Sequence, residues 1–175
     1  LLTDPDGFKL SRRRVTVSTA GVVPGIERFG REELGVGLAV SLNATTDIVR
    51  SRIMPINKKW PITELLGALR QYPLEARRRI TIEYVLIKDL NDSDADARRL
   101  VALMRGLRCK VNLIMFNPTE HLPYRRVDED RLEYFTRVLS DAHLTVTVRW
   151  SKGQEIEAAC GQLAAHHFEA IHEQS

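Results

Sequence analysis

The chain has 175 residues, of which 43% are hydrophobic, and its formal net charge is +3. That is enough for one globular domain with a substantial core, or for a piece of a larger domain. No apolar run approaches the roughly 20 residues of a membrane span, and the amino-terminal residues lack a signal-peptide pattern. Two cysteines far apart in sequence do not make a disulfide framework, so we expect a reducing, cytoplasmic location and no membrane partner.

Five apolar runs rich in β-branched residues predict β-strands. In chain order they cover residues 14–18, 36–41, 80–86, 110–116 and 144–149. Helical patterns lie between them, at residues 62–72, from 93 to about 107, and from 128 onward. Strand alternating with helix is typical of α/β proteins with a parallel sheet whose faces are covered.

The ends of the three expected helices carry their own signals. Pro61 suits a first helical turn, and Pro73 ends the same segment. Ser93 followed by Asp96 has the spacing of a helix cap. Asp128 places a negative charge at the start of the last helix, where it interacts favourably with the helix dipole.

Small polar residues follow three of the expected strands at the point where each strand ends. Ser18 and Ser41 come at the ends of the first and second strands, and Asn117 comes after the fourth. In a parallel barrel these carboxyl ends share one rim, where such side chains hold ligands. Each of them alone is also an ordinary transition from strand to loop. Three in corresponding positions favour a binding site.

Basic residues are clustered although the net charge is small. The clusters lie at residues 12–14, 58–59, 77–79, 98–99 and 125–126. Any one of them alone is typical of a solvated end of a helix or strand. Together with a sequence pI near 9.0, they indicate a phosphate-rich partner.

Cys160 stands between small residues, in the segment AACGQLA at 158–164. A thiol with so little steric cover suits a nucleophile that a substrate approaches closely. Ile156, Cys160 and Leu163 also share one helical face, and free cysteine is often buried, so packing is the alternative. The segment alone favours packing, whereas the motifs upstream of it favour the nucleophile.

Six motifs in a fixed order extend over nearly the whole chain, from about residue 8 to residue 164. They are RRVTVSTAGVVP at 13–24, LAVSLNA at 38–44, MPINKK at 54–59, IEYV at 82–85, CKVNLI at 109–114 with Asn117-Pro118, and AACGQLA at 158–164. Together they closely resemble the radical S-adenosylmethionine adenine-C2 methyltransferases of ribosomal and transfer RNA, the RlmN family. The resemblance implies an α/β fold, namely an incomplete parallel (β/α) radical-SAM-type barrel.

The resemblance also implies roles for individual residues. Five of them match positions that contact S-adenosylmethionine in this family: Ser18, Ser41, Leu42, Asn43 and Asn117. Asn43 stands where the family more often has a histidine, and its amide can still exchange a hydrogen bond with a ribose hydroxyl. The second cysteine, Cys109, matches a common family residue without assigned chemistry, and we expect it to pack in the core.

Cys160 matches the family cysteine that becomes S-methylated and carries the methyl group. Carbon 2 of adenine is electron-poor and does not attack a methyl sulfonium, so the resemblance implies a radical route. One S-adenosylmethionine methylates the Cys160 thiolate; a second, cleaved reductively at a [4Fe-4S] cluster, yields the radical that activates this methyl group. The implied partners are 23S ribosomal RNA, transfer RNA and an electron donor such as flavodoxin or ferredoxin.

Several family features are missing from the sequence, namely the Cys-x3-Cys-x2-Cys cluster motif, a second catalytic cysteine and a helical RNA-binding domain. Two cysteines cannot supply three thiolate ligands, so we expect the cluster ligands to lie outside this chain. Residues 1–175 are therefore interpreted as the carboxyl-terminal part of a radical SAM methyltransferase domain, inactive when isolated.

Other interpretations stay open. The nearest is the related C8-methylating resistance enzyme, although residues 22–24 and 57–59 favour the C2 branch. A non-catalytic RNA-binding α/β module would use the arginines alone, with Cys160 merely packed. A metabolic (β/α) barrel enzyme would need an acid–base pair or a phosphate loop, and neither is evident. Glu83, inside a strand, is a candidate barrel-interior carboxylate, but we favour a structural role. A frayed terminus, rather than a metal site, is expected at His166, His167 and His172.

Overall fold

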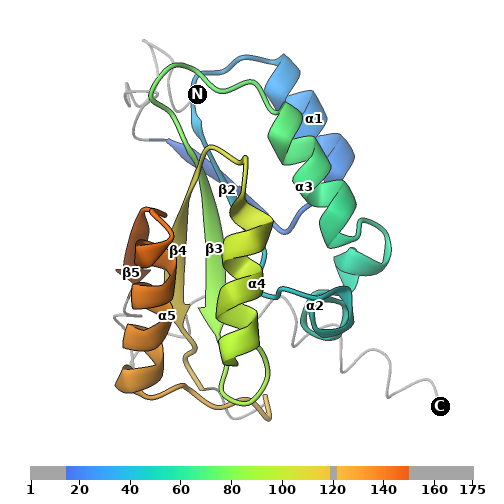
Figure 1. Ribbon diagram of the computed structural model, residues 1–175. Helices are drawn as coiled ribbons and strands as arrows, with labels where there is room; N and C mark the ends of the chain where they lie inside the picture. Colours follow the sequence, from blue (N-terminus) through green and yellow to red (C-terminus); the bar gives the residue numbers. More distant parts are fainter. Residues whose placement is uncertain (1–14, 119–121, 150–175) are drawn as a thin grey trace, which may run out of the picture.

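The computed structural model describes residues 15–118 and 122–149, which form a five-stranded sheet with helices packed against it (Figure 1). The strands are β1 (Thr16–Thr19), β2 (Gly37–Ser41), β3 (Ile80–Leu86), β4 (Cys109–Met115) and β5 (Val146–Arg149). Each strand pairs in parallel with the next, so their order in the sheet is their order in the chain. The expected strands and the partial parallel barrel are confirmed.

The helices are α1 (Val23–Arg31), α2 (Asp47–Ile53), the 3-10 helix η2 (Pro55–Lys58), α3 (Ile62–Gln71), α4 (Asp94–Met104) and α5 (Glu129–Asp141). The last three were expected. The sequence analysis missed α1, which has no side-chain N-cap, and α2 with η2, which are only one or two turns each. No helix in the described part of the chain is long and apolar enough to cross a bilayer.

Side-chain caps explain why two of the helices begin where they do. The Ser93 hydroxyl accepts from the Asp96 N–H at 3.1 Å, and the Asp96 carboxylate accepts from the Ser93 N–H, which together make a capping box at α4. At α5 the Asp128 carboxylate accepts from the Arg131 N–H at 3.0 Å. Both caps agree with the sequence-based expectation.

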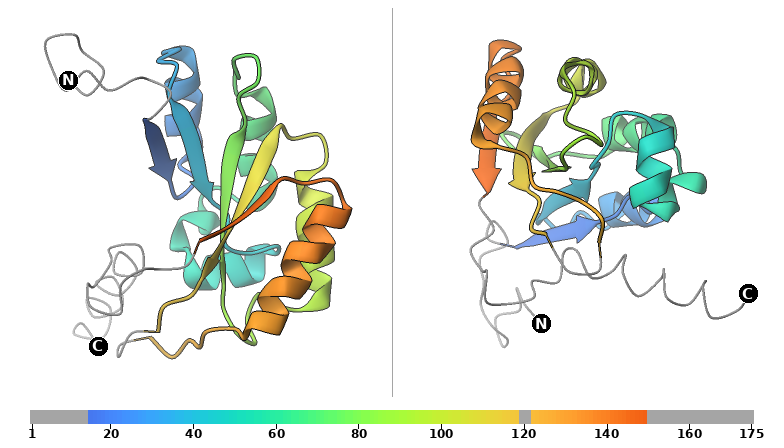
Figure 2. Two further views of the ribbon diagram at one scale, coloured as in Figure 1. Left: turned by 90° about the vertical axis from the view of Figure 1, so that its left-hand side faces the viewer. Right: turned by 90° about the horizontal axis from the view of Figure 1, so that it is seen from below.

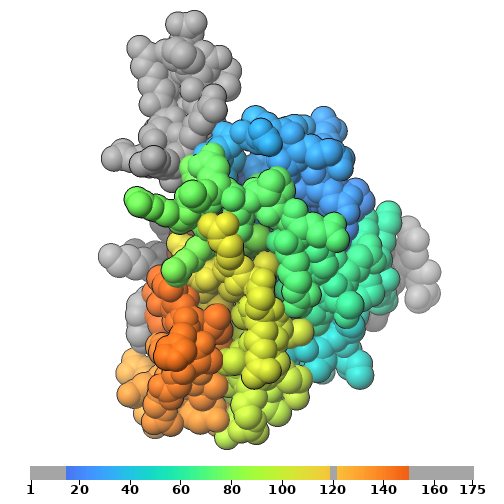
Figure 3. All heavy atoms as spheres, turned by 45° about the horizontal axis from the view of Figure 1, so that its top comes forward, coloured from blue at the N-terminus to red at the C-terminus, as the bar shows by residue number. Residues whose placement is uncertain are grey.

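The helices cover one face of the sheet. Figure 2 shows the sheet curved, with the helices gathered on its outer side, and Figure 3 shows that α1 and α3, and likewise α4 and α5, lie side by side. The buried core fills the space between helices and sheet; at its centre are Val40, Ile82, Tyr84, Leu113 and Phe135. Strand β3 alternates between apolar residues that face the helices and more polar residues on the other side, as expected for one wall of a partial barrel.

Polar side chains occupy the other face of the sheet. Strand register aligns Ser41 with Glu83, Glu83 with Asn112, and Asn112 with Thr147. These four residues form a row across β2 to β5, which we call the polar row. Thr147 donates from its hydroxyl to Asn112 Oδ1 at 3.1 Å. In a parallel barrel this face is the interior, so the polar row gives the interior its chemical character.

Candidate functional site

Two of the predicted site residues converge on one carboxylate oxygen. Ser18, near the end of β1, and Ser41, the last residue of β2, each place Oγ 3.3 Å from Glu83 Oε2. Ser18 is exposed, and Ser41 and Glu83 are half-buried. Asn117 lies two residues beyond β4, at the same carboxyl edge of the sheet, and its side chain is exposed. The structure thus brings Ser18 and Ser41 together at Glu83 and places Asn117 further along the same edge, beyond the end of β4.

Leu42 has a supporting position. Its side chain is 1% exposed and belongs to the hydrophobic core. Its N–H donates to the Glu83 carbonyl at 3.0 Å, and its carbonyl accepts from Arg50 Nε at 3.0 Å and from the Ala44 N–H at 2.8 Å. Both backbone groups of Leu42 are thus used to hold the loop that follows Ser41.

Asn43 takes a left-handed backbone conformation, with φ of 57°, which asparagine tolerates better than most residues. Its Oδ1 accepts from the Val85 N–H at 3.0 Å, and its carbonyl accepts from Asn91 Nδ2 at 2.7 Å. The amide nitrogen contacts Met54 Sδ at 3.3 Å, and a thioether is a weak acceptor. The amide nitrogen is therefore the group of Asn43 with capacity left for a ligand.

Arg50, in α2, is a residue that the sequence analysis missed. Its side chain is fully buried, at 0% exposed. Nε donates to the Leu42 carbonyl, and Nη2 donates to the carbonyls of Ser41 at 3.1 Å and Ala20 at 2.7 Å. Ala20 follows β1, and Ser41 ends β2. One guanidinium thus ties together the two loops that carry the predicted serines.

A second layer of hydrogen bonds holds Arg50 in place. Arg50 Nη1 donates to Asn57 Oδ1 at 2.9 Å, and Asn57 Nδ2 donates to Asp47 Oδ1 at 3.0 Å and to Ser51 Oγ at 2.9 Å. Asp47 Oδ1 also accepts from the Ile62 N–H at 2.8 Å. Burial lowers the pKa of Arg50 to about 10, against the opposing pull of the Asp47 carboxylate, so the guanidinium stays charged at neutral pH.

Gly21 gives the Arg50 side chain its room. Its φ of 106° is one that only glycine adopts readily. A Cβ at this position would lie 3.0 Å from Arg50 Nη2 and 3.1 Å from Leu65 Cδ2. The conformation and the space both require glycine in the loop after β1.

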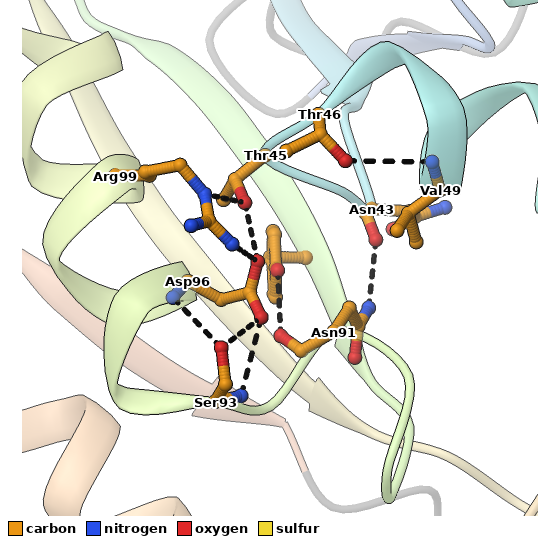
Figure 4. A network of polar contacts seen from close by, with 9 residues as sticks. Asn43, Thr45, Thr46, Val49, Asn91, Ser93, Asp96 and Arg99 are labelled. Atoms are coloured by element: carbon orange, nitrogen blue, oxygen red, sulfur yellow. Dashed lines mark hydrogen bonds and ion pairs between the residues drawn. The ribbon is translucent and has the colours of Figure 1, made fainter.

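A polar network attaches the loop after β2 to α4 (Figure 4). Thr45 donates from its hydroxyl to Asp96 Oδ1 and accepts from Arg99 Nε at 3.0 Å, while Arg99 also pairs with the Asp96 carboxylate. Burial opposes ionisation of Asp96, but hydrogen bonds from Ser93, Thr45 and Arg99 outweigh it and lower the pKa of Asp96. The network thus fixes residues 43–46 to α4 and to the loop before it, whereas Arg50 binds the backbone just before them.

Only one of the two cysteines, Cys109, lies within the described residues. Cys109 begins β4, is 7% exposed and lies 3.6 Å from Met104 Sδ; burial raises the pKa of its thiol to about 11, so it is an unreactive core residue, as expected. Cys160 lies outside the described residues, as do Arg12 to Arg14, His166, His167 and His172. The described residues hold no cluster of three side chains suited to a metal ion.

The arginine clusters are spread over the molecule. Four arginines, Arg77, Arg78, Arg79 and Arg108, line a hollow of about 500 Å³ at the amino-terminal edge of the sheet. This is the edge opposite to Ser18 and Ser41, and Figure 3 brings it towards the viewer. Arg99 and Arg125 are engaged with Asp96 and Asp89 respectively. The clusters therefore do not form one patch around the candidate site.

Comparison with known proteins gives related chains of one kind. No family model matches the chain. The dual-specificity RNA methyltransferase RlmN of Jannaschia sp. (strain CCS1) is 53% identical over 161 residues, which are 91% of this chain and 41% of the relative. The same-named protein of Geotalea uraniireducens (strain Rf4) is 51% identical over 171 residues, 98% of this chain and 50% of the relative.

Solved structures agree with these relatives. A radical SAM methyltransferase from Sphaerobacter thermophilus superposes with a TM-score of 0.86 at 48% identity, over 92% of this chain and 47% of that chain. A domain of the pyruvate-formate lyase-activating enzyme from Bacteroides vulgatus superposes at 0.59 with 17% identity, which supports the fold alone. The chain spans about half the length of the curated relatives that it matches, and over that half it belongs to the RlmN family of radical SAM methyltransferases.

Proposed function

We propose that the chain is the carboxyl-terminal part of an enzyme that methylates carbon 2 of adenine in 23S ribosomal RNA and transfer RNA. The observation that carries the proposal is its identity of about one half, along nine-tenths of its length, with proteins named dual-specificity RNA methyltransferases. The convergence of Ser18 and Ser41 at the carboxyl edge of the sheet supports a ligand site there.

S-adenosylmethionine fits the groups at this edge. The exposed or half-buried side chains of Ser18, Ser41 and Asn117 offer several hydrogen-bonding groups. The amide nitrogen of Asn43 adds a donor. When bound, S-adenosylmethionine supplies the methyl group and the radical precursor. The chain's own polar side chains would orient the cofactor. Arg50 holds the two loops that carry the serines, through its hydrogen bonds to the Ala20 and Ser41 carbonyls.

An iron–sulfur cluster does not fit the residues of this chain. The sequence has two cysteines, and the thiol of Cys109 is buried with a raised pKa. Three thiolate ligands are therefore not available here. We propose that the cluster ligands, the helical RNA-binding domain and the docking site of an electron donor such as flavodoxin or ferredoxin belong to other parts of the protein.

Cys160 is assigned the role of methyl carrier. Cys160 would supply the thiolate nucleophile, and S-adenosylmethionine, when bound, would supply the methyl group that this sulfur accepts in exchange for S-adenosylhomocysteine as leaving group. The residues beside it in the sequence, at 158–161, are small, which suits a nucleophile that a substrate approaches closely. The adenine must leave its base stack to reach this residue. Such substrates imply a cytoplasmic location.

The experiment is product analysis with the complete protein. The anaerobically reconstituted enzyme, incubated with S-adenosylmethionine, a reductant and either 23S ribosomal RNA or transfer RNA, is expected to produce 2-methyladenosine, detected by mass spectrometry of digested RNA. 8-Methyladenosine would identify the C8-methylating alternative, and RNA binding without any methylated adenosine would overturn the enzymatic proposal.

Two cysteine variants sharpen this experiment. Cys160→Ala should abolish product while changing stability little, because alanine is a close substitute for a small apolar side chain. Peptide mass spectrometry should find one methyl group on Cys160 of the wild-type enzyme. Cys109→Ala is the matched control and should retain turnover. Turnover by Cys160→Ala would remove this residue from the mechanism.

A further inference from the structure

Glu83 accepts a hydrogen bond from each of the two serines, and the direction of these bonds determines how the serines can interact with a ligand. An ionised carboxylate has acceptors and no donors. Each serine has one O–H group and two lone pairs. The contacts of 3.3 Å from Ser18 Oγ and Ser41 Oγ to Glu83 Oε2 therefore use the hydroxyl proton of both serines.

With their protons directed to Glu83, the serines can only accept from a third group. We propose that Glu83 is a positioning residue that turns Ser18 and Ser41 into paired hydrogen-bond acceptors for donor groups of S-adenosylmethionine. The inference rests on the proposed function. This cofactor carries such donors in its ribose hydroxyls, its exocyclic amine and its ammonium group.

The geometry around Glu83 favours a fixed orientation. Its carbonyl accepts from the N–H groups of Leu42 and Asn43, so the end of β2 is bound directly to the residue that bears the carboxylate. Arg50 Nη2 donates a hydrogen bond to the Ser41 carbonyl at 3.1 Å and so fixes the backbone of this serine. Within the described residues Glu83 Oε1 has no hydrogen-bond partner, so both serine contacts are made to Oε2 alone.

The test is a coupling measurement on the complete enzyme, with S-adenosylmethionine as the titrant in a calorimeter. Glu83→Met keeps the approximate size of the side chain but removes both oxygen acceptors, so the serine hydroxyls are no longer held as acceptors for the cofactor and affinity should fall about tenfold. In the background Ser18→Ala with Ser41→Ala, the same change should alter affinity by less than about twofold, because its targets are gone. An equal loss in both backgrounds, or no loss in either, would overturn the inference.

Two further variants separate positioning from charge and from folding. Glu83→Asp keeps the charge but draws the carboxylate away from the serines, and it should also weaken binding; unchanged affinity would show that charge alone matters and would refute the positioning role. Thr81→Val, on the same strand and face, is the control and should bind like the wild type. If the wild-type enzyme itself binds no S-adenosylmethionine, the proposed function fails, whereas an inert Glu83→Met in a binding enzyme defeats only this inference.

Discussion

The two faces of the sheet are formed by the same strands but differ in the side chains that they carry. In β3, Ile82 and Tyr84 point into the core at 0% exposed, while Glu83 between them faces the uncovered side. The apolar face is filled by helices and carries the stability of the fold. On the other face, the hydroxyl and carboxylate groups of Ser41, Glu83 and Thr147 are at least partly exposed, whereas the Asn112 amide is buried. The comparison predicts that stability and ligand binding can be altered separately.

The largest effect on stability is expected on the apolar face. Leu113→Ala removes a fully buried side chain of β4 and should lower the free energy of unfolding by roughly 2–5 kcal/mol. Thr147→Val, on the polar row of the neighbouring strand, should cost less than about 1 kcal/mol, since it loses only the contacts of one exposed hydroxyl, to Asn112 Oδ1 at 3.1 Å and to the Val111 carbonyl at 3.5 Å. Urea denaturation of both variants would measure the difference. Equal losses would contradict the division between the faces.

A smaller effect on stability is expected at Arg50, which holds together the loops that follow β1 and β2. Arg50→Lys keeps the charge but cannot reach the carbonyls of Ala20, Ser41 and Leu42 together, so we expect a loss of roughly 1–3 kcal/mol. Binding at the carboxyl edge should weaken as well, because the loops are no longer tied. Arg52→Lys, exposed on the same helix, is the matched control for urea denaturation and should stay within about 0.5 kcal/mol of the wild type.

The smallest effect concerns Asp96, which supports the loop after β2 from the side of α4. Asp96→Asn should destabilise the protein by about 1 kcal/mol at pH 7, chiefly through the weakened capping box. The pKa of this carboxylate is lowered in the folded state, so its contribution is present above its ordinary value of 3.8 and is lost as the pH falls through the lower folded value. The gap between wild type and variant should therefore close below about pH 4. A gap that stays constant from pH 7 to pH 3 would refute this account.

Local patterns in the sequence were sufficient for much of the fold. The five strands, the capping box of Ser93 and the cap at Asp128 could be predicted because each depends on neighbours a few residues away. Helix α1 could not, since it lacks such a cap and is held instead by packing against α3, where Gly30 lies close to Pro73.

The candidate site was predictable only in part, for the same reason. Ser18, Ser41 and Asn117 stand out because they follow strands, but Glu83 is 65 residues from Ser18 and 42 from Ser41. We judged its role as structural; the strand register aligns it with Ser41, and the hydrogen bonds show that Ser18 shares it. Arg50 lies in a short polar segment, and nothing in the sequence indicates that its side chain is buried beneath two loops.

The order of the strands has a consequence for how the protein is made. Because each strand pairs with the one synthesised just before it, no strand has to wait for a partner from a distant part of the chain. When each strand after β1 leaves the ribosome, the strand with which it pairs has already been synthesised, and so has the segment that connects the two. The sheet can thus grow by one strand at a time during translation, in the direction from β1 to β5.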